Sequence, residues 1–473
     1  MPEAGILSQL PRVDEAAVDA ALAQELAANS DKLVVLDDDP TGVQTVHDVS
    51  VYTDWSETSI REGFEEDGRL FYILTNSRAM TAAESERVHR EIGDTLMRVS
   101  RETGRGFMLL SRCDSTLRGH YPLETQVLRE RLEAAGHAVD GEVLCPFFKE
   151  GGRFTLGGVH YVQQGDELVP AAQTEFAADR TFGYSSSDLP GYIEEKTRGE
   201  YPATGVTLIP IEQLRACDYE GITQKLLAVH DFGKVCVDAA DYCDVKVFSV
   251  ALYRAAAQGR SFIFRTAASL VKALGGVSDR PLLRREEMIT RPGGGIVVVG
   301  SHTHKTTEQL EHLLELEGVR AVEFDSDLVL EGDAAFGAEI DRCVAEAERL
   351  ISSGLTAVCY TKRKLLELPG DTKEGALMRS VKISDGVQSL VARLGVTPAF
   401  VVAKGGITSS DVGTKALAVR RARVLGQIQP GVPVWLTGPE SRFPNTPYVI
   451  FPGNTGGPDT LRLAVETLTH HEK

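Results

Sequence analysis

The sequence predicts an α/β protein with two domains, each built on a mainly parallel sheet flanked by helices. Three observations predict this fold class. Short apolar runs alternate with longer segments in which apolar residues recur at helical spacing. The chain has 473 residues, too many for one core when domains of roughly 150 residues are common. The alternation also breaks over residues 275–295 and then begins again.

The first half of the chain contains the first run of alternating elements. Buried strands separated by helices of this length imply right-handed crossovers, so we expect neighbouring strands to run parallel. The strands are expected at 32–38, 49–54, 69–75, 106–112, 142–148, 234–241 and 261–265, and the helices at 81–102, 122–136 and 242–259.

The stretch 275–295 is rich in Gly, Pro and charge, which is typical of a domain boundary. We therefore expect a domain over 31–280 and another over 281–473, preceded by an N-terminal helical extension over 1–30. An Ala-rich helix in that extension is expected to serve packing or a homo-oligomer contact rather than chemistry. Beyond the boundary, strands are expected at 295–300, 320–325, 356–362, 399–406, 433–438 and 448–453, with a helix at 306–318.

Composition excludes several classes of partner. Lys and Arg number 50 against 68 Asp and Glu, so the net charge of −18 repels a polyanion and predicts no nucleic-acid partner. The seven cysteines form no C-x-x-C pair, which fits a reducing compartment. The first residues lack a signal-peptide pattern, and no apolar run approaches the ~20 residues that span a bilayer. We expect a cytoplasmic protein without a membrane partner.

Three adjacent carboxylates, Asp37, Asp38 and Asp39, follow the first apolar run, and Pro40 and Gly42 then turn the chain. In open parallel sheets, ligands bind beyond the carboxyl ends of strands. A single Asp here would favour a turn in which the side chain caps backbone amides. Three in a row repel one another unless a cation or a ligand group lies nearby, so they indicate a binding or catalytic site.

Arginines recur after the expected strands of the same half. Arg78 lies just past the strand expected at 69–75, and Arg112 ends the strand expected at 106–112. Arg118 and Arg153 lie in loops that follow later strands of this half. Arg binds carboxylate or phosphate through two parallel hydrogen bonds, so this repetition in an acidic protein predicts an anion site. Asp114 and Ser115 lie among these arginines, a mixture that suits a polyhydroxylated acid.

Three glycine-rich loops follow strands of the second half, which indicates a nucleotide. Neither a P-loop nor a G-x-G-x-x-G pattern occurs. His302 and His304 lack a partner set with metal-ligand spacing, so we expect loop histidines and name no metal ligand in the protein. The candidate nucleotide-binding residues in these loops are Ser301, Lys404, Gly405, Gly406, Ile407, Thr408, Gly453, Asn454 and Gly456.

These motifs together resemble the four-carbon acid sugar kinase family, from about Lys32 to about Leu463. The resemblance implies an N-terminal substrate domain, a C-terminal nucleotide domain, an active site in the interdomain cleft, and ATP-dependent phosphorylation of a sugar-acid hydroxyl. The chain departs from the family at Asp37, where a small residue is usual, and at Pro40, where an apolar one is usual. The motifs that carry the resemblance are DDPTG, TNSR, DSTLRG, GGRFTLGG, GSH, KGGITS and PGNTGG.

The resemblance also implies roles for individual residues. Asp38 or Asp39 would accept the proton of the attacking hydroxyl, and the sequence does not choose between them. Arginines would bind the substrate carboxylate, and Mg²⁺ would bridge the phosphates of ATP. The expected substrate-binding residues are Arg78, Asp114, Ser115, Arg118 and Arg153, and the expected ATP contacts are Ser301, residues 405–408 and Gly453.

Two other functions remain open from the sequence. One is a sugar-acid dehydrogenase or lyase whose glycine-rich loops hold a different cofactor, although the missing dinucleotide pattern disfavours it. The other is a non-catalytic nucleotide-binding effector. An intact set of acids and arginines disfavours that function, because a protein that only binds needs no proton acceptor.

Overall fold

The computed structural model describes residues 3–364, 366, 368, 370–453 and 455–470. The described chain divides into two compact units. Unit 1 contains residues 3–45 and 54–279, and unit 2 contains residues 46–53 and 280–470. Each unit is an α/β structure, as predicted, and each is described in turn.

Unit 1 is built on a seven-stranded sheet in which every pairing is parallel. The strands are apolar and almost fully buried, because helices cover both faces of a parallel sheet. In spatial order they are β3 (Leu70–Leu74), β1 (Lys32–Asp37), β4 (Phe107–Arg112), β11 (Phe262–Thr266), β5 (Gly141–Cys145), β10 (Gly233–Val237) and β9 (Thr207–Ile209).

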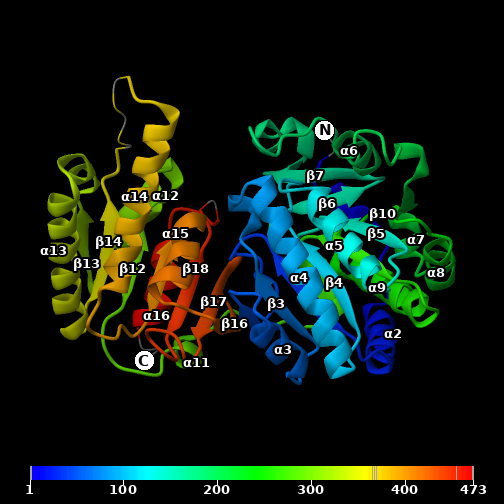
Figure 1. The fold of residues 1–473 in the computed structure, drawn as a ribbon, viewed down its shortest axis with the longest axis horizontal. Helices are drawn as coiled ribbons and strands as arrows, with labels where there is room; N and C mark the ends of the chain where they lie inside the picture. The colour runs from blue at the N-terminus through cyan, green and yellow to red at the C-terminus, as the bar shows by residue number, and fades with distance from the viewer. Residues whose placement is uncertain (1–2, 365, 367, 369, 454, 471–473) are drawn as a thin grey trace. The chain divides into compact units, whose positions relative to one another are not determined.

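The helices of unit 1 form where the expected signals occur. In α4 (Ala82–Thr103), the Thr81 and Glu84 side chains form a capping box, and Gly104 at φ 68° ends the helix. Figure 1 shows α4 and α5 (Leu123–Ala134) lying side by side over the sheet of this unit. The remaining longer helices of the unit are α2 (Glu15–Ala28), α3 (Glu57–Glu65), α6 (Leu189–Lys196), α8 (Tyr219–Leu227), α9 (Tyr242–Ala257) and α10 (Ala268–Gly275).

The N-terminal helix α2 packs against α9 of the same unit. Its apolar residues Val18 and Leu22 are buried. Ion pairs flank this contact, with Lys246 Nζ 2.6 Å from Asp19 and Arg254 Nε 2.7 Å from Glu25. The extension thus packs on unit 1 through an apolar stripe bordered by charge.

A second, antiparallel sheet in unit 1 was not among the expected elements. It consists of β6 (Arg153–Leu156), β7 (Val159–Gln164) and β8 (Glu167–Pro170). The amide of Ala4 donates to the carbonyl of Asp166 at 2.8 Å, so the N-terminal segment also contacts this sheet. Its strands are short and only partly buried, which explains why no clear period-2 pattern marks them.

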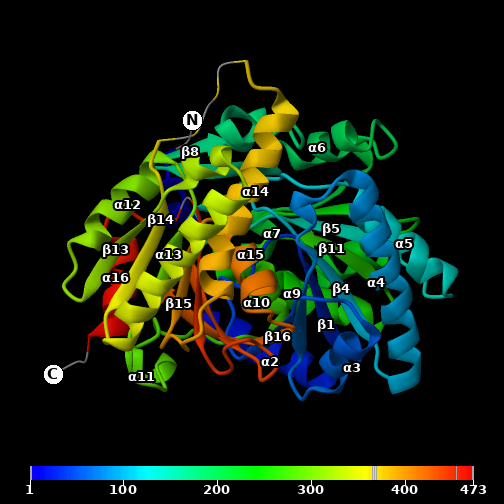
Figure 2. The ribbon, with the colours of Figure 1, turned by 60° about the vertical axis from the view of Figure 1, so that its left-hand side comes forward.

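Unit 2 has an eight-stranded mixed sheet. The five strands from β13 to β18 in the sheet order run parallel to one another. The last three strands, β17, β16 and β2, continue the sheet from β18 through antiparallel pairings. Figure 2 shows α14 (Lys373–Ala392) and α15 (Gly406–Asp411) next to one another in this unit. The strands in order are β13 (Val319–Phe324), β14 (Thr356–Thr361), β12 (Ile296–Val299), β15 (Val401–Lys404), β18 (Pro447–Phe451), β17 (Val432–Thr437), β16 (Arg421–Gln429) and β2 (Val49–Tyr52). The other long helices are α12 (His304–Leu314), α13 (Asp333–Ser352) and α16 (Thr460–Thr469).

Strand β2 comes from the N-terminal part of the chain but belongs to the sheet of unit 2. We expected a strand at 49–54 among the parallel strands of the first half. Instead, β2 pairs antiparallel with β16, with Tyr52 opposite Arg421. Asp48 just before it lies 3.1 Å from Arg280 and also pairs with Arg423.

None of the helices in the described part of the chain combines the length and the apolar character that a membrane span requires.

Candidate functional site

The three adjacent acids lie where β1 ends, at the carboxyl edge of the parallel sheet in unit 1. Asp37 and Asp38 are 2% and 3% exposed. The turn that follows them requires glycine, because a Cβ on Gly42 would lie 1.9 Å from Oδ2 of Asp37. The sequence therefore folds so that two carboxylates are packed under a tight turn.

Asp39 is held in place by hydrogen bonds and an ion pair. The backbone amide of Thr41 donates to its Oδ1 at 2.8 Å, and Arg78 pairs with its Oδ2. Burial acts to raise the pKa of Asp39, but Arg78 and the two hydrogen bonds from Thr41 outweigh it and lower that pKa. A carboxylate fixed in this way is a poor proton acceptor.

Asp38 differs from its neighbour in that its carboxylate accepts no hydrogen bond from the described residues. Within the part of the chain that the structure describes, neither of its carboxylate oxygens has a hydrogen-bond partner, and both are buried. Nη1 of Arg112 is 3.5 Å from its Oδ1. Burial raises the pKa of Asp38 to about 6, against the opposing effect of Arg78 and Arg112. Asp38 can thus accept a proton near neutral pH.

Arg112 at the end of β4 is shared by two acids. Its Nη1 donates to Oδ1 of Asp37 at 3.2 Å and lies slightly farther from Asp38. Burial raises the pKa of Asp37 to about 7, with Arg112 acting in the opposite direction. The sequence predicts Arg112 in the anion site, but in the structure its guanidinium is buried beside Asp37 and Asp38.

Arg78 and Arg118 meet at Asp114. Arg78 follows β3 after Asn76, whose left-handed φ of 54° turns the chain. Its Nη1 is 3.4 Å from Oδ1 of Asp114, and Nε of Arg118 is 2.7 Å from Oδ2. Burial opposes these arginines, but together with Thr116 they hold the pKa of Asp114 far below its usual range. Since Arg78 also pairs with Asp39, the structure brings together predicted residues from the loops after β1, β3 and β4.

Arg118 and Arg153 pack against the same aromatic ring. Their guanidinium carbons lie 5.0 and 5.8 Å from the centre of the Phe176 ring. Among the described residues, no carboxylate lies within ion-pair distance of Arg153, and its Nε has no hydrogen-bond partner. A half-buried guanidinium without a carboxylate partner among the described residues is suited to bind an anionic ligand.

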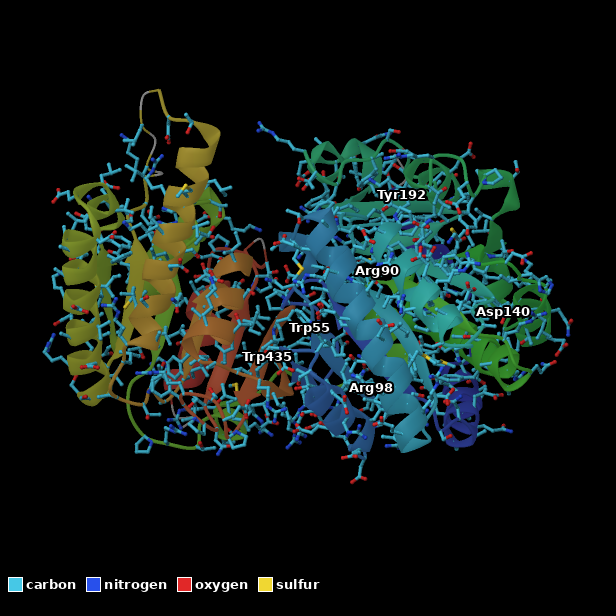
Figure 3. The ribbon with its side chains drawn as sticks, in the orientation of Figure 1. Trp55, Arg90, Arg98, Asp140, Tyr192 and Trp435 are labelled. Atoms are coloured by element: carbon cyan, nitrogen blue, oxygen red, sulfur yellow. The ribbon has the colours of Figure 1, made fainter. Side chains whose placement is uncertain are left out.

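The loop that carries Ser115 and Arg118 is held by three side chains that the sequence analysis missed. Ser115 is nearly buried, and its carbonyl accepts from Nε2 of His160 at 2.8 Å. The carbonyls of the next two residues accept, also at 2.8 Å, from the hydroxyls of Tyr184 and Tyr192, the latter labelled in Figure 3. Burial lowers the pKa of His160 to about 4, so its ring stays neutral. No local sequence signal marks these residues, because they reach the loop from far along the chain.

The three glycine-rich loops of unit 2 meet at the carboxyl ends of the neighbouring strands β12, β15 and β18. A Cβ on Gly300 would lie 2.6 Å from Oγ1 of Thr408. Gly405 adopts φ 114°, and its Cβ would lie 3.5 Å from Cβ of Ser301. These glycines therefore allow the loops to approach one another more closely than larger residues would.

Lys404 connects the second loop to the third. It is 0% exposed, and its Nζ donates to the carbonyls of Pro452 at 2.7 Å and Gly453 at 3.0 Å. Burial, with a smaller effect of Lys305, lowers the pKa of Lys404 to about 7. Lys404 therefore orients a loop in this structure rather than presenting its charge to a ligand.

The helix α12 fixes the other side of the third loop. Nε2 of Gln309 donates to the carbonyls of Thr455 at 3.0 Å and Gly457 at 2.8 Å, a contact that the sequence analysis missed. Gly456 adopts φ 77° between them.

The candidate residue Asn454 lies outside the described residues. Gly406 opens α15, and Ile407, its next residue, is 72% exposed.

The first loop is anchored from both sides. The hydroxyl of Ser301 lies 3.3 Å from that of Thr306 in α12, and its carbonyl accepts from Arg363. His302 lies 3.3 Å from the hydroxyl of Thr361, and His304 begins α12. The described residues contain no group of three or more His, Cys, Asp or Glu side chains that could hold a metal ion.

Sequence comparison connects each unit to a known kind of domain. Residues 33–274 match a family model described as a sugar-binding N-terminal domain, and residues 296–461 match one described as a nucleotide-binding C-terminal domain. The protein is thus of a class in which a sugar-binding domain precedes a nucleotide-binding domain. More particularly, the chain belongs to the four-carbon acid sugar kinase family, as its motifs predict.

Individual relatives are distant. A 3-oxo-tetronate kinase from Cupriavidus necator is 31% identical over 179 residues, which cover 38% of this chain and 39% of that protein. Solved structures from Salmonella typhimurium LT2 and Haemophilus influenzae superpose with TM-scores of 0.67 and 0.61, each at 18% identity. The two matches cover 92% of this chain and 98% and 100% of those chains, so they share its fold.

Proposed function

We propose that this protein is an ATP-dependent kinase that phosphorylates a hydroxyl group of a small sugar acid, most simply one of four carbons. The observation that carries the proposal is Asp38. It is a buried carboxylate without a hydrogen-bond partner among the described residues, at the strand edge of the sugar-binding domain. Such a group is suited to accept the proton that a sugar hydroxyl loses when it attacks a phosphoryl group.

Two arginines near Asp114 supply the recognition of an acid. Arg153 lacks a carboxylate partner among the described residues, and Arg118 lies against the same Phe176 ring. We assign these two guanidinium groups to the substrate carboxylate, which accepts parallel hydrogen bonds from Arg. Asp114 and Ser115 would orient the remaining hydroxyls. Asp39 and Arg78 neutralise each other, so they fix the shape of the pocket rather than take the proton.

The loops of unit 2 are suited to hold the nucleotide. Gly405, with its positive φ, suits a loop that phosphates approach closely, and the dipole at the N-terminus of α12, next to Ser301, favours an anion. When bound, ATP would supply the phosphoryl group, and Mg²⁺ would be held chiefly by its phosphates. In this proposal the hydroxyl comes from unit 1 and the phosphoryl group from unit 2, so positioning is the main source of rate.

An ATP-consumption assay over a panel of four- to six-carbon sugar acids, with Mg²⁺ present, tests the proposal. We expect ADP formation with at least one acid, a stoichiometric phosphorylated product by ³¹P NMR, and loss of both signals in Asp38→Asn. Binding of NAD in place of ATP, measured by fluorescence titration, together with oxidation of a sugar acid, would contradict the kinase assignment. ATP binding without turnover of any acid would instead support an effector.

A further inference from the structure

Two buried carboxylates at the end of β1 compete for one guanidinium. Arg112 is 5% exposed, and its Nη1 donates to Asp37 at 3.2 Å while it stays 3.5 Å from Asp38. Its Nε has no hydrogen-bond partner among the described residues, so the Asp37 contact is the bond that orients it. The arrangement leaves the carboxylate of Asp38 close to a positive charge but without a hydrogen bond from any described residue.

Asp37 is itself fixed in position. The backbone amide of Asp39 donates to its Oδ1 at 3.3 Å, and its Oδ2 lies against the backbone of Gly42, where no side chain fits. Because Asp37 cannot move toward the turn, its carboxylate remains directed at Arg112. Four acids and bases face Asp37, namely Arg112 from β4, Tyr72 from β3, and Asp38 and Asp39 from its own loop.

We propose that Asp37 is a positioning residue: by holding the guanidinium of Arg112, it keeps the carboxylate of Asp38 free to accept the proton of the substrate. This inference rests on the proposed function. Tyr72 contributes no charge, because burial and the nearby Asp37 raise the pKa of its hydroxyl well above the ordinary value. Asp39 is already paired with Arg78, so Arg112 is the charged group that changes partner when Asp37 loses its charge.

A neutral Asp37 would alter Asp38 in two ways that act together. Arg112 would be free to hydrogen-bond Asp38, and a like charge next to Asp38 would disappear. Both changes stabilise the ionised form of Asp38, so both lower its pKa and make it a weaker base. A protonated Asp37 has the same effect, so the wild-type kcat should fall in two successive steps as the pH is lowered: about tenfold as Asp37 gains a proton, and then further as Asp38 is protonated.

The test is Asp37→Asn, which keeps the shape of the side chain and removes its charge. With the sugar acid found in the panel, kcat is measured from acidic to basic pH. We expect the first of the two steps to disappear, so that kcat falls with a single protonation about one pH unit below the wild-type midpoint, and the plateau kcat to fall about tenfold. KM for the sugar acid should change less than about threefold, because Asp37 makes no contact with the substrate in this proposal.

Asp67→Asn, an exposed acid in the turn before β3, is the matched control and should keep the wild-type profile. A crystal structure of Asp37→Asn provides a readout that needs no substrate, and should show Arg112 hydrogen-bonded to Asp38. An unchanged pH profile in an active Asp37→Asn enzyme, or an Arg112 that keeps its wild-type distance from Asp38, would overturn the inference. If wild-type protein phosphorylates no acid while Arg112 still moves, the proposed function fails and the coupling of the two acids stands.

Discussion

The two units build their candidate sites from different materials. In unit 1 the site consists of ionised side chains, with Asp38, Asp39 and Asp114 set among Arg78 and Arg112. In unit 2 the loops consist of glycines and carbonyls, and their lysine is buried in hydrogen bonds to backbone. Substitutions in unit 1 should therefore act through charge, whereas those in unit 2 should act through backbone shape.

The largest effect that separates the units is expected from Asp38→Asn. An amide cannot accept the hydroxyl proton, so kcat should fall by roughly 10²–10⁴-fold, with little change in KM for ATP. Steady-state kinetics with both substrates varied measure this. Asp39→Asn is the matched comparison, and because Asp39 is already paired with Arg78, its kcat should fall less. Near-wild-type turnover in Asp38→Asn would show that Asp38 is not the base.

Arg153→Met sharpens the contrast on the substrate side. Loss of a charge-assisted hydrogen bond to a carboxylate is typically about 1.5–3 kcal/mol, so KM for the sugar acid should rise about 10- to 100-fold. KM for ATP should stay within about twofold of the wild-type value, because the substitution removes no contact with the nucleotide. Arg90→Met, on the outer surface of α4 and labelled in Figure 3, removes an arginine with carboxylate partners and should change neither constant. An equal rise in both variants would refute the assignment of Arg153.

Gly405→Ala tests the backbone of unit 2. At φ 114° an alanine is strained by about 1–3 kcal/mol, and relaxation of the loop should raise KM for ATP about tenfold. KM for the sugar acid should not change. Gly318→Ala is the control, since Gly318 also has positive φ but no atom near its Cβ. It should lower the melting temperature without affecting ATP; if it raises KM for ATP equally, the loop assignment is wrong.

The smallest expected effect concerns pH and stability. The pKa of Lys404 is lowered to about 7 by burial, so its charged form destabilises the folded state at acidic pH. Relative to Lys404→Met, wild type should gain stability as the pH rises from about 7 toward about 10, where the unfolded lysine also loses its proton. Thermal melts at a series of pH values should show the difference growing by a few degrees, and a constant difference would contradict it.

Much of the fold follows from local pattern. The strands around Val34, Phe71 and Val298 were predictable because continuous apolar runs between helices are typical of buried parallel strands. The family motifs also marked the loops that meet in each unit. The pairing of β2 with β16 was not predictable, because strand pairing depends on a partner distant in the sequence, and the strand itself carries no sign of that partner.

The chemistry of the site was predictable only in part. The sequence marks three adjacent acids but cannot distinguish them, because their difference lies in Thr41, Arg78 and Arg112, which only the fold brings to different carboxylates. His160 and Phe176 were missed for a related reason. They come from a small sheet and short turns that lack clear periodicity, and they act on loops already identified.

Strand β2 imposes an order on biosynthesis. Ser50 accepts a hydrogen bond from Arg421, which lies 371 positions later in the chain. During translation the segment 46–53 of unit 2 leaves the ribosome long before β16, while the whole of unit 1 is made by residue 279. The pairing of β2 with β16 therefore forms only after residue 429 has been made, and a fragment that begins at residue 281 would leave that edge of β16 open to aggregation.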